Sequence, residues 1–110
     1  MEFETIPARD LNRYVRDRHS VIIDLRSPEE YQEAHIMGAV NIPFEELEKG
    51  LPYSRAQELV LYCERGSTSM AAARELAEKN YRVKSVVGGI HAYRGPYLVE
   101  GKRQPGREYF

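Results

Sequence analysis

Cysteine is scarce in this sequence, and long apolar runs are absent. The 110 residues contain one cysteine, Cys63, which excludes an internal disulfide and therefore a disulfide-stabilised secreted scaffold. No apolar run approaches the roughly 20 residues that a membrane-spanning helix needs, and the charged N-terminus lacks the apolar core of a signal peptide. We therefore expect a cytoplasmic protein without a membrane partner.

An excess of either charge is lacking as well. The chain has 16 Lys and Arg against 17 Asp and Glu, interspersed along the sequence, for a net charge of −1. This balance offers no broad basic surface, so we expect no nucleic-acid partner. With 42% hydrophobic and 30% charged residues, the composition is that of an ordinary folded protein, and the length suits one domain.

Motifs for metals and nucleotide cofactors are also missing. The three histidines and the single cysteine do not have the spacing of metal ligands. The sequence contains neither a phosphate-binding glycine motif with its lysine nor a dinucleotide fingerprint. We therefore predict no metal and no cofactor.

What the sequence does contain is an alternation of strand-like and helix-like segments. Residues 21–25, 59–62 and 83–87 are predicted to be strands, and the β-branched apolar run at 21–25 is typical of a strand covered on both faces. Ser27 is predicted to cap a short helix, and residues 67–79 to form an alanine-rich one. Strands that alternate with helices predict an α/β domain with a mainly parallel sheet.

The segments between these elements carry weaker signals. Residues 1–5 suit a brief edge strand, and residues 7–16 a helix that begins with proline. Residues 35–43 are predicted to form an ordered loop with several apolar anchors. Residues 44–49 are predicted to form a short helix that Gly50 ends.

The C-terminal segment has no periodic pattern. From residue 95 onward, glycine, proline and charged residues recur irregularly. We therefore predict a folded domain at residues 1–95 and an irregular tail at residues 96–110. Tyr97, Leu98 and Val99 are the tail residues that could pack on the domain.

The chemistry of the chain centres on residues 63–69, which lie between the predicted strand 59–62 and the predicted helix 67–79. A strand that feeds a short loop and then a helix brings several backbone N–H groups to one point, and these groups favour a negative charge. Cys63 occupies the first position of this loop, where a thiolate is stabilised relative to the thiol. Cys63 is therefore the candidate nucleophile. The alternative is that it is a small buried hydrophobic residue.

The rest of the loop is predicted to bind the substrate. Gly66 lets the backbone curve without a side chain, and three hydroxyl residues follow it. A positive charge at Arg65 would favour an anionic substrate, and Glu64 would oppose it. The candidate substrate-binding residues are Glu64, Arg65, Gly66, Ser67, Thr68 and Ser69.

An ordered series of short motifs resembles single-domain members of the rhodanese family of sulfurtransferases. The series comprises Asp24-Leu25-Arg26, Glu30-Tyr31, Ala34-His35-Ile36, Gly38-Ala39, Asn41-Ile42-Pro43, Tyr62-Cys63 with Gly66 and Ser69, Gly88-Gly89-Ile90 and Ala92-Tyr93. The resemblance implies a rhodanese-like three-layer domain, with a central, mainly parallel five-stranded sheet flanked by helices. It covers most of the chain.

The resemblance also implies an activity. Cys63 would carry a persulfide, taking a sulfane sulfur from thiosulfate or another persulfide donor and passing it to a thiophilic acceptor. A sulfur-accepting protein is a further candidate partner. Backbone N–H groups from Glu64 to Ser69 would hold the persulfide anion.

Two positions depart from the family pattern. The family loop is commonly Cys-x-x-Gly-x-Arg-Ser, and Thr68 takes the place of its arginine. This substitution removes a fixed charge beside an anionic donor, for which Arg65 is a possible substitute. Ala34 stands where a glycine usually precedes the loop histidine.

Other polar residues have structural interpretations. Arg26 is expected to pair with a nearby acid such as Glu30, and Asp24 to accept hydrogen bonds from its loop. His35 is expected to fix its loop by a hydrogen bond rather than to act as a general base, and His91 to lie at the surface. Gly88-Gly89 is predicted to form a tight turn.

Two rival functions are weighed against the sulfurtransferase. A phosphatase related in fold would need a longer loop and an arginine six residues after the cysteine, where this chain has Ser69. A non-catalytic rhodanese-like module that binds a partner or senses a small molecule fits the missing loop arginine but not the retained cysteine.

Overall fold

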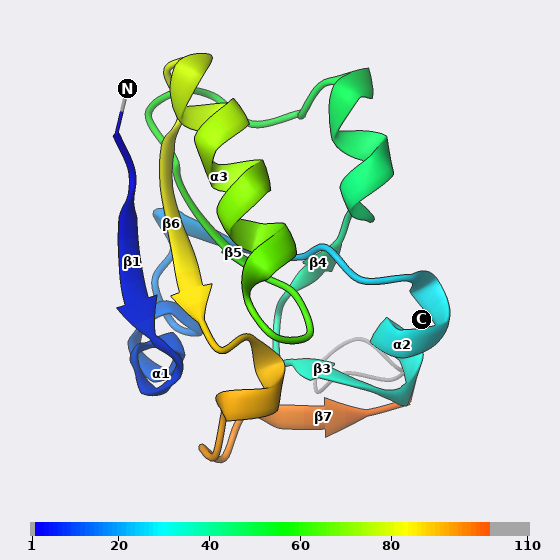
Figure 1. Ribbon diagram of the computed structural model, residues 1–110. Helices are drawn as coiled ribbons and strands as arrows, with labels where there is room; N and C mark the ends of the chain where they lie inside the picture. Colours follow the sequence, from blue (N-terminus) through cyan, green and yellow to red (C-terminus); the bar gives the residue numbers. More distant parts are fainter. Residues whose placement is uncertain (1, 102–110) are drawn as a thin grey trace.

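Five parallel strands form the central sheet of the protein, as the computed structural model, which describes residues 2–101, shows (Figure 1). All neighbouring strands in this sheet run parallel. Their order across the sheet is β1 (Glu4–Pro7), β6 (Arg82–Val87), β5 (Glu58–Tyr62), β2 (Ser20–Asp24) and β4 (Val40–Asn41). The predicted α/β class with a five-stranded parallel sheet is confirmed.

Strand β5 lies at the centre of the sheet and is buried on both faces. Its residues Leu59 to Tyr62 are each 0% exposed. Val60 and Tyr62 belong to the apolar cluster on one face, whereas Leu59 and Leu61 belong to the cluster on the other. Because both faces are covered, the strand has an unbroken apolar sequence.

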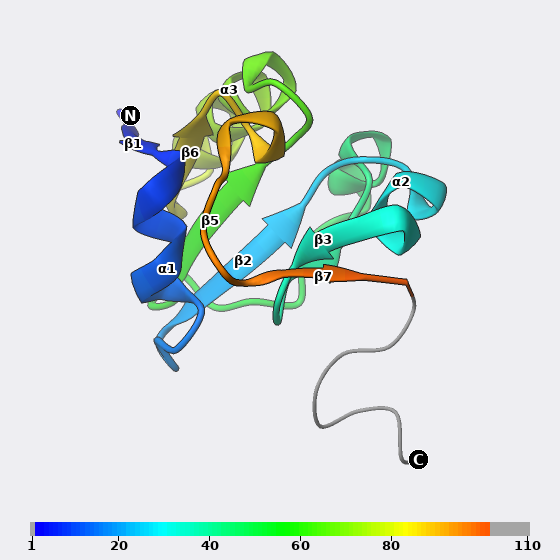
Figure 2. The same ribbon diagram turned by 90° about the horizontal axis from the view of Figure 1, so that it is seen from below.

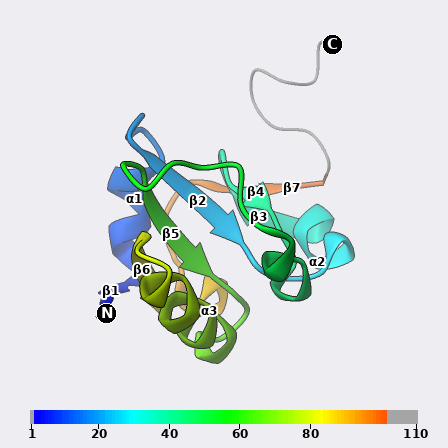
Figure 3. The ribbon, with the colours of Figure 1, turned by 90° about the horizontal axis from the view of Figure 1, so that it is seen from above.

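Helices and a small second sheet cover the two faces. Helix α3 (Ser67–Glu78) and the 3₁₀ helix η2 (Phe44–Lys49) lie on one face (Figures 1 and 3). The 3₁₀ turn η1 (Ala8–Asp10), helix α1 (Leu11–Tyr14) and the pair β3–β7 lie on the other (Figure 2). On α3, the buried small residues Ala72, Ala73 and Ala77 let the helix approach the sheet closely. Within residues 2–101, no helix is both long enough and apolar enough to cross a membrane.

Helix α2 (Pro28–Glu33) begins as its sequence predicts. The Ser27 Oγ accepts a hydrogen bond from the Glu30 backbone N–H at 3.2 Å, and the Glu30 carboxylate accepts one from the Ser27 N–H at 3.1 Å. This reciprocal capping box satisfies two N–H groups at the helix start. By contrast, the helix expected at residues 7–16 is shorter and begins as a 3₁₀ turn.

The segment predicted as an ordered loop at residues 35–43 contains two short strands. Strand β3 (Ala34–Ile36) and strand β4 (Val40–Asn41) flank a turn at Gly38. Strand β4 is an edge of the main sheet, in register with Ile23 and Asp24 of β2. Strands of two or three residues are too short for a recognisable period, so the loop prediction was wrong at these positions.

The segment predicted as an irregular tail also contains a strand. Strand β7 (Leu98–Glu100) pairs antiparallel with β3, and the Met37 N–H donates to the Tyr97 carbonyl at 2.8 Å. The prediction of irregular structure therefore needs correction at residues 98–100, because pairing with β3 satisfies their backbone groups. Residues 102–110 of the predicted tail lie outside the described residues. We propose that the domain extends past residue 95 to include β7.

Candidate active site

Cys63 follows directly on β5, and its sulfur faces the start of helix α3. The backbone N–H of Gly66 lies 3.1 Å from the Cys63 Sγ, and that of Ser69 lies 3.3 Å from it. Gly66 precedes the first helical residue and has φ 108°, in the left-handed region that favours glycine. Two N–H dipoles and the positive end of α3 thus point at one sulfur atom, an arrangement that stabilises negative charge there.

The other loop residues occupy different environments. The side chains of Glu64, Arg65 and Ser67 are exposed, whereas Thr68 is half-buried. The buried Ser69 hydroxyl donates to the Gly66 carbonyl at 3.0 Å and lies 2.8 Å from the Ser85 Oγ. The Ser69 hydroxyl thus supports the loop, while its backbone N–H faces the sulfur.

A pocket of about 330 Å³ lies over Cys63. It is lined by residues of the β2–α2 connection, of helix α2, of η2 and of the cysteine loop. These residues are Leu25, Arg26, Ser27, Glu30, Phe44, Glu45, Cys63, Glu64 and Thr68. Of the predicted substrate-binding side chains, Glu64 and Thr68 line the pocket, whereas Arg65 and Ser67 do not. Cys63 itself is 5% exposed.

A larger concavity of about 730 Å³ lies at the carboxyl ends of β1 and β6. Its lining includes Pro7, Arg9, Val87 and Arg94, and it contains neither a cysteine nor an acidic residue. The smaller pocket is lined by Cys63, on whose sulfur the N–H groups of Gly66 and Ser69 converge, and it is therefore the candidate active site.

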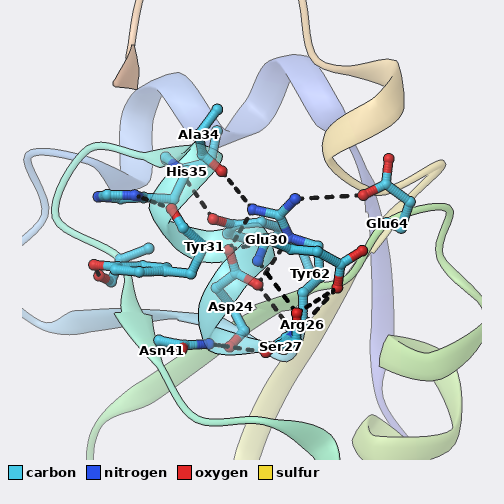
Figure 4. Close-up of polar contacts among 12 residues, drawn as sticks. Asp24, Arg26, Ser27, Glu30, Tyr31, Ala34, His35, Asn41, Tyr62 and Glu64 are labelled. Atoms are coloured by element: carbon cyan, nitrogen blue, oxygen red, sulfur yellow. Dashed lines mark hydrogen bonds and ion pairs between the residues drawn. The ribbon is translucent and has the colours of Figure 1, made fainter. Parts of the chain in front are cut away.

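An arginine network joins the β2–α2 connection to the cysteine loop (Figure 4). The Arg26 side chain, 8% exposed, donates from Nε and Nη2 to the buried Asp24 carboxylate at 2.9–3.2 Å. Its Nη2 also donates to the Ala34 carbonyl at 2.5 Å, and its Nη1 lies 3.3 Å from the Glu64 carboxylate. Burial tends to lower the pKa of Arg26, but the hydrogen bonds and charge of Asp24 outweigh it and raise that pKa. Arg26 therefore remains charged and ties three segments together.

The network corrects one detail of the sequence analysis. The partners of Arg26 are Asp24 and Glu64, whereas the expected partner Glu30 caps helix α2. Asp24 accepts from the Arg26 backbone N–H at 2.9 Å, as expected for a loop-fixing carboxylate. The contact between Arg26 and Glu64 spans 38 positions, so no local pattern indicates it.

The histidines lie outside the pocket lining. His35 is fully buried, its Nδ1 lies 2.7 Å from the Tyr31 carbonyl, and its ring stacks on Tyr31 at 3.7 Å between centroids (Figure 4). The expected role of His35 in fixing its loop agrees with this contact. His91 is exposed, as predicted. In the described part of the chain, no three His, Cys, Asp or Glu side chains gather as metal ligands would.

The turn after β6 donates backbone hydrogen bonds to the cysteine loop. The Ile90 N–H donates to the Cys63 carbonyl at 2.9 Å, and the His91 N–H donates to the Glu64 carbonyl at 3.1 Å. A Cβ added to Gly89, which has φ 61°, would lie 2.4 Å from the Cys63 carbonyl oxygen. The sequence predicted this turn but gave no indication that the cysteine loop rests on it.

Comparison with known proteins decides the family. The sequence-family model of the rhodanese-like domain matches residues 7–95 of the chain. The chain belongs to the rhodanese-like family. Its fold and its cysteine loop agree with the resemblance seen in the sequence.

Several relatives of this rhodanese-like chain are named as sulfurtransferases. A tRNA sulfurtransferase of Desulfurococcus amylolyticus is 40% identical over 75 residues, which are 68% of this chain but 15% of that protein. The thiosulfate sulfurtransferase PspE of Escherichia coli is 34% identical over 62% of this chain and 68% of its own length. A rhodanese-related protein of Thermoplasma volcanium has a TM-score of 0.79 at 27% identity, covering 88% of this chain and 98% of that one. The chain thus spans only a small part of the first of these relatives.

Proposed function

We propose that the protein is a sulfurtransferase that carries a sulfane sulfur as a persulfide on Cys63. The observation that carries this proposal is the position of the Cys63 Sγ, which lies 3.1 and 3.3 Å from two backbone N–H groups and belongs to a residue that lines a pocket. Such preorganised donors stabilise a thiolate before the reaction and a persulfide anion after it. The family membership and the names of the relatives support the same class of reaction.

The first half-reaction loads the cysteine. The Cys63 thiolate attacks the outer sulfur of thiosulfate or of another persulfide donor, and a bond forms between that sulfur and Sγ. The sulfur–sulfur bond of the donor breaks, and its electron pair leaves with sulfite or with the donor thiolate. The persulfide extends one sulfur atom beyond the thiolate. We therefore expect the backbone N–H groups of residues 64–69 to donate hydrogen bonds to this outer sulfur.

The second half-reaction needs an acceptor from outside these 110 residues. Cys63 is their only cysteine, so no second thiol in this segment can take the sulfur from it. A thiophilic acceptor, such as a thiolate or cyanide, attacks the outer sulfur and releases the Cys63 thiolate with the electron pair of the broken bond. A sulfur-accepting protein fits the same requirement.

The first prediction concerns this loading step. Incubation with thiosulfate or inorganic polysulfide is expected to add one sulfur atom to the protein, as measured by intact mass, because the pocket presents the thiolate to the donor. The matched control Cys63→Ser is expected to gain no sulfur. Cyanide is expected to remove the added sulfur as thiocyanate, in an amount equal to the loaded protein.

A non-catalytic binding module is the second candidate function, and one observation favours it. The side chain that lines the pocket at the usual position of the loop arginine is the uncharged Thr68. If thiosulfate, polysulfide and an uncharged organic persulfide all fail to add sulfur to Cys63, and Cys63→Ser melts at the temperature of the wild type, the catalytic proposal fails and the binding module is preferred.

A further inference from the structure

Negative charges surround the pocket over Cys63. Three glutamates, Glu30, Glu45 and Glu64, line it together with a single arginine, Arg26. Glu30 belongs to helix α2, Glu45 to η2 and Glu64 to the cysteine loop, so the carboxylates come from three separate elements. A donor that approaches the sulfur therefore meets carboxylates contributed from three segments of the chain.

The single arginine does not offset these charges. Asp24, which is 0% exposed, holds the Arg26 guanidinium through Nε and Nη2, and Glu64 contacts its Nη1 at 3.3 Å (Figure 4). Its positive charge is thus matched by a buried carboxylate before Glu64 is counted. With 8% of its side chain exposed, Arg26 has little surface left for an anionic ligand.

The cysteine loop supplies no other cation to the pocket. Thr68 lines it with a neutral side chain, and Arg65 is exposed and absent from its lining. The positive influence that remains is that of the N–H groups beneath Sγ, which acts over about one helical turn. The N–H groups at Sγ thus favour a sulfur anion, whereas the side chains that line the pocket disfavour an anionic group on the remainder of the donor.

We propose that the Cys63 pocket selects the donor by charge: it takes sulfur from a neutral or cationic persulfide and disfavours a dianion such as thiosulfate. This inference rests on the proposed sulfurtransferase function and specifies its substrate class. The preferred reaction is attack of the Cys63 thiolate on the outer sulfur of R–S–SH. The Sγ–S bond forms, the S–S bond of the donor breaks, and the electron pair leaves as R–S⁻. The proton of the transferred sulfur is then released to R–S⁻ or to solvent, which leaves the persulfide anion on Cys63.

The test measures how fast Cys63 is loaded from donors that differ in charge. The probes are the persulfides of cysteamine, 2-mercaptoethanol and mercaptosuccinate, which are cationic, neutral and dianionic in the reacting R–S–SH form, together with thiosulfate. Each rate of sulfur gain, followed by intact mass, is divided by the rate of the same donor with free cysteine, which removes the intrinsic reactivity of the donor. The normalised rate for cysteamine persulfide is expected to exceed that for mercaptosuccinate persulfide by about tenfold at low salt.

Salt and charge variants identify the source of the preference. About 0.5 M NaCl is expected to lower the ratio of the normalised loading rates from cysteamine and mercaptosuccinate persulfides, because salt screens the charges at the pocket. Glu45→Gln is expected to raise the rate of loading from mercaptosuccinate persulfide about threefold, and Thr68→Arg is expected to raise it further. Both variants are expected to lower the rate of loading from cysteamine persulfide. The matched control is Glu48→Gln, which changes the net charge equally but alters an exposed glutamate of η2 outside the pocket lining. Its donor ratio is expected to equal that of the wild type.

The outcomes separate this inference from the function on which it rests. If no donor loads Cys63, the sulfurtransferase proposal itself fails. If all donors load at similar normalised rates, or if Glu45→Gln and Glu48→Gln behave alike, the protein remains a sulfurtransferase but selection by charge is overturned. A preference for the cationic donor that salt and Glu45→Gln both weaken supports the inference.

Discussion

At the level of single residues, Gly89 has the most constrained position beside the active site. Its φ of 61° and ψ of −160° belong to a region that is essentially restricted to glycine. The carbonyl oxygens of Cys63 and Glu64 would lie 2.4 and 2.5 Å from a Cβ at this position. Both the backbone conformation and the close approach of the cysteine loop therefore require glycine.

Gly89→Ala is expected to destabilise the protein by roughly 3 kcal/mol, since it adds a backbone clash to backbone strain. Gly50→Ala is the matched control, because Gly50 also has a positive φ, 94°, but has no heavy atom near an added Cβ. We expect it to cost about 1 kcal/mol, from backbone strain alone. Urea unfolding measures both costs, and Cys63 loading is expected to slow only in Gly89→Ala. Equal losses in the two variants would show that contact with the cysteine loop is unimportant.

The residues of the site differ in how far the sequence could predict them. The position of Cys63 after a buried strand and before a helix follows from local patterns, and the structure has that arrangement. The ion pair between Arg26 and Glu64 depends on β2 and β5 lying side by side, which places distant loops together. The exclusion of Arg65 from the pocket lining depends on loop conformation, which residue type does not determine.

At the level of elements, strand β6 is linked to both its neighbours through one side chain. The Lys84 ammonium contacts the Glu58 carboxylate of β5 and lies 3.3 Å from the Glu4 carboxylate of β1. Lys84 is 17% exposed and Glu58 is 20% exposed, so this pair is better shielded than an ordinary surface ion pair. Burial tends to lower the pKa of Lys84, but the hydrogen bonds to Glu58 and Glu4 outweigh it and raise that pKa above 10.5.

Lys84→Met is expected to lower the free energy of unfolding by about 1 kcal/mol near neutral pH, because it leaves Glu58 without its cation. Because the pKa of Lys84 is higher in the folded state than its value of 10.5 in the unfolded chain, its protonation stabilises the fold fully at pH values below 10.5. That contribution is lost as the pH rises through the pKa of the folded state. The wild type should therefore lose more stability than Lys84→Met between about pH 10 and pH 12. Urea unfolding across this range tests the difference. The exposed Lys49, replaced by Met, serves as the control and should keep the wild-type pH profile.

The elements that the sequence predicted are those specified locally. Ser27, Pro28 and Glu30 determine the start of α2 within four residues. The unbroken apolar run of β5 indicates a buried strand, and its residues are buried in the structure. Strands β3, β4 and β7 have two or three residues each and exist only through their partners. Pairing of that kind depends on the whole fold and leaves no periodic pattern in the sequence.

At the level of the whole molecule, strand β7 is connected to the candidate active site through a chain of contacts. Strand β7 pairs with β3, in register at Ala34, and the Ala34 carbonyl accepts a hydrogen bond from Arg26. Arg26 in turn contacts Glu64, the residue next to Cys63. Tyr97, just before β7, packs on the apolar cluster that includes Ile36. The end of the described chain thus supports both the core and the position of the cysteine loop.

Two truncations test whether the domain ends at residue 95 or includes β7. Ending the chain after Gly95 is expected to lower the free energy of unfolding by about 2 kcal/mol and the melting temperature by about 10 °C, because it removes the β3–β7 pairing and the packing of Tyr97. Ending it after Gly101 removes only residues without a periodic apolar pattern, so its melting temperature should stay within about 2 °C of the wild type. Thermal unfolding gives both values, and the rate of Cys63 loading should fall only in the shorter chain, since only there does Ala34 lose its partner strand. If the two truncated proteins have the same melting temperature and the same rate of Cys63 loading, β7 contributes nothing to stability and the boundary at residue 95 is retained.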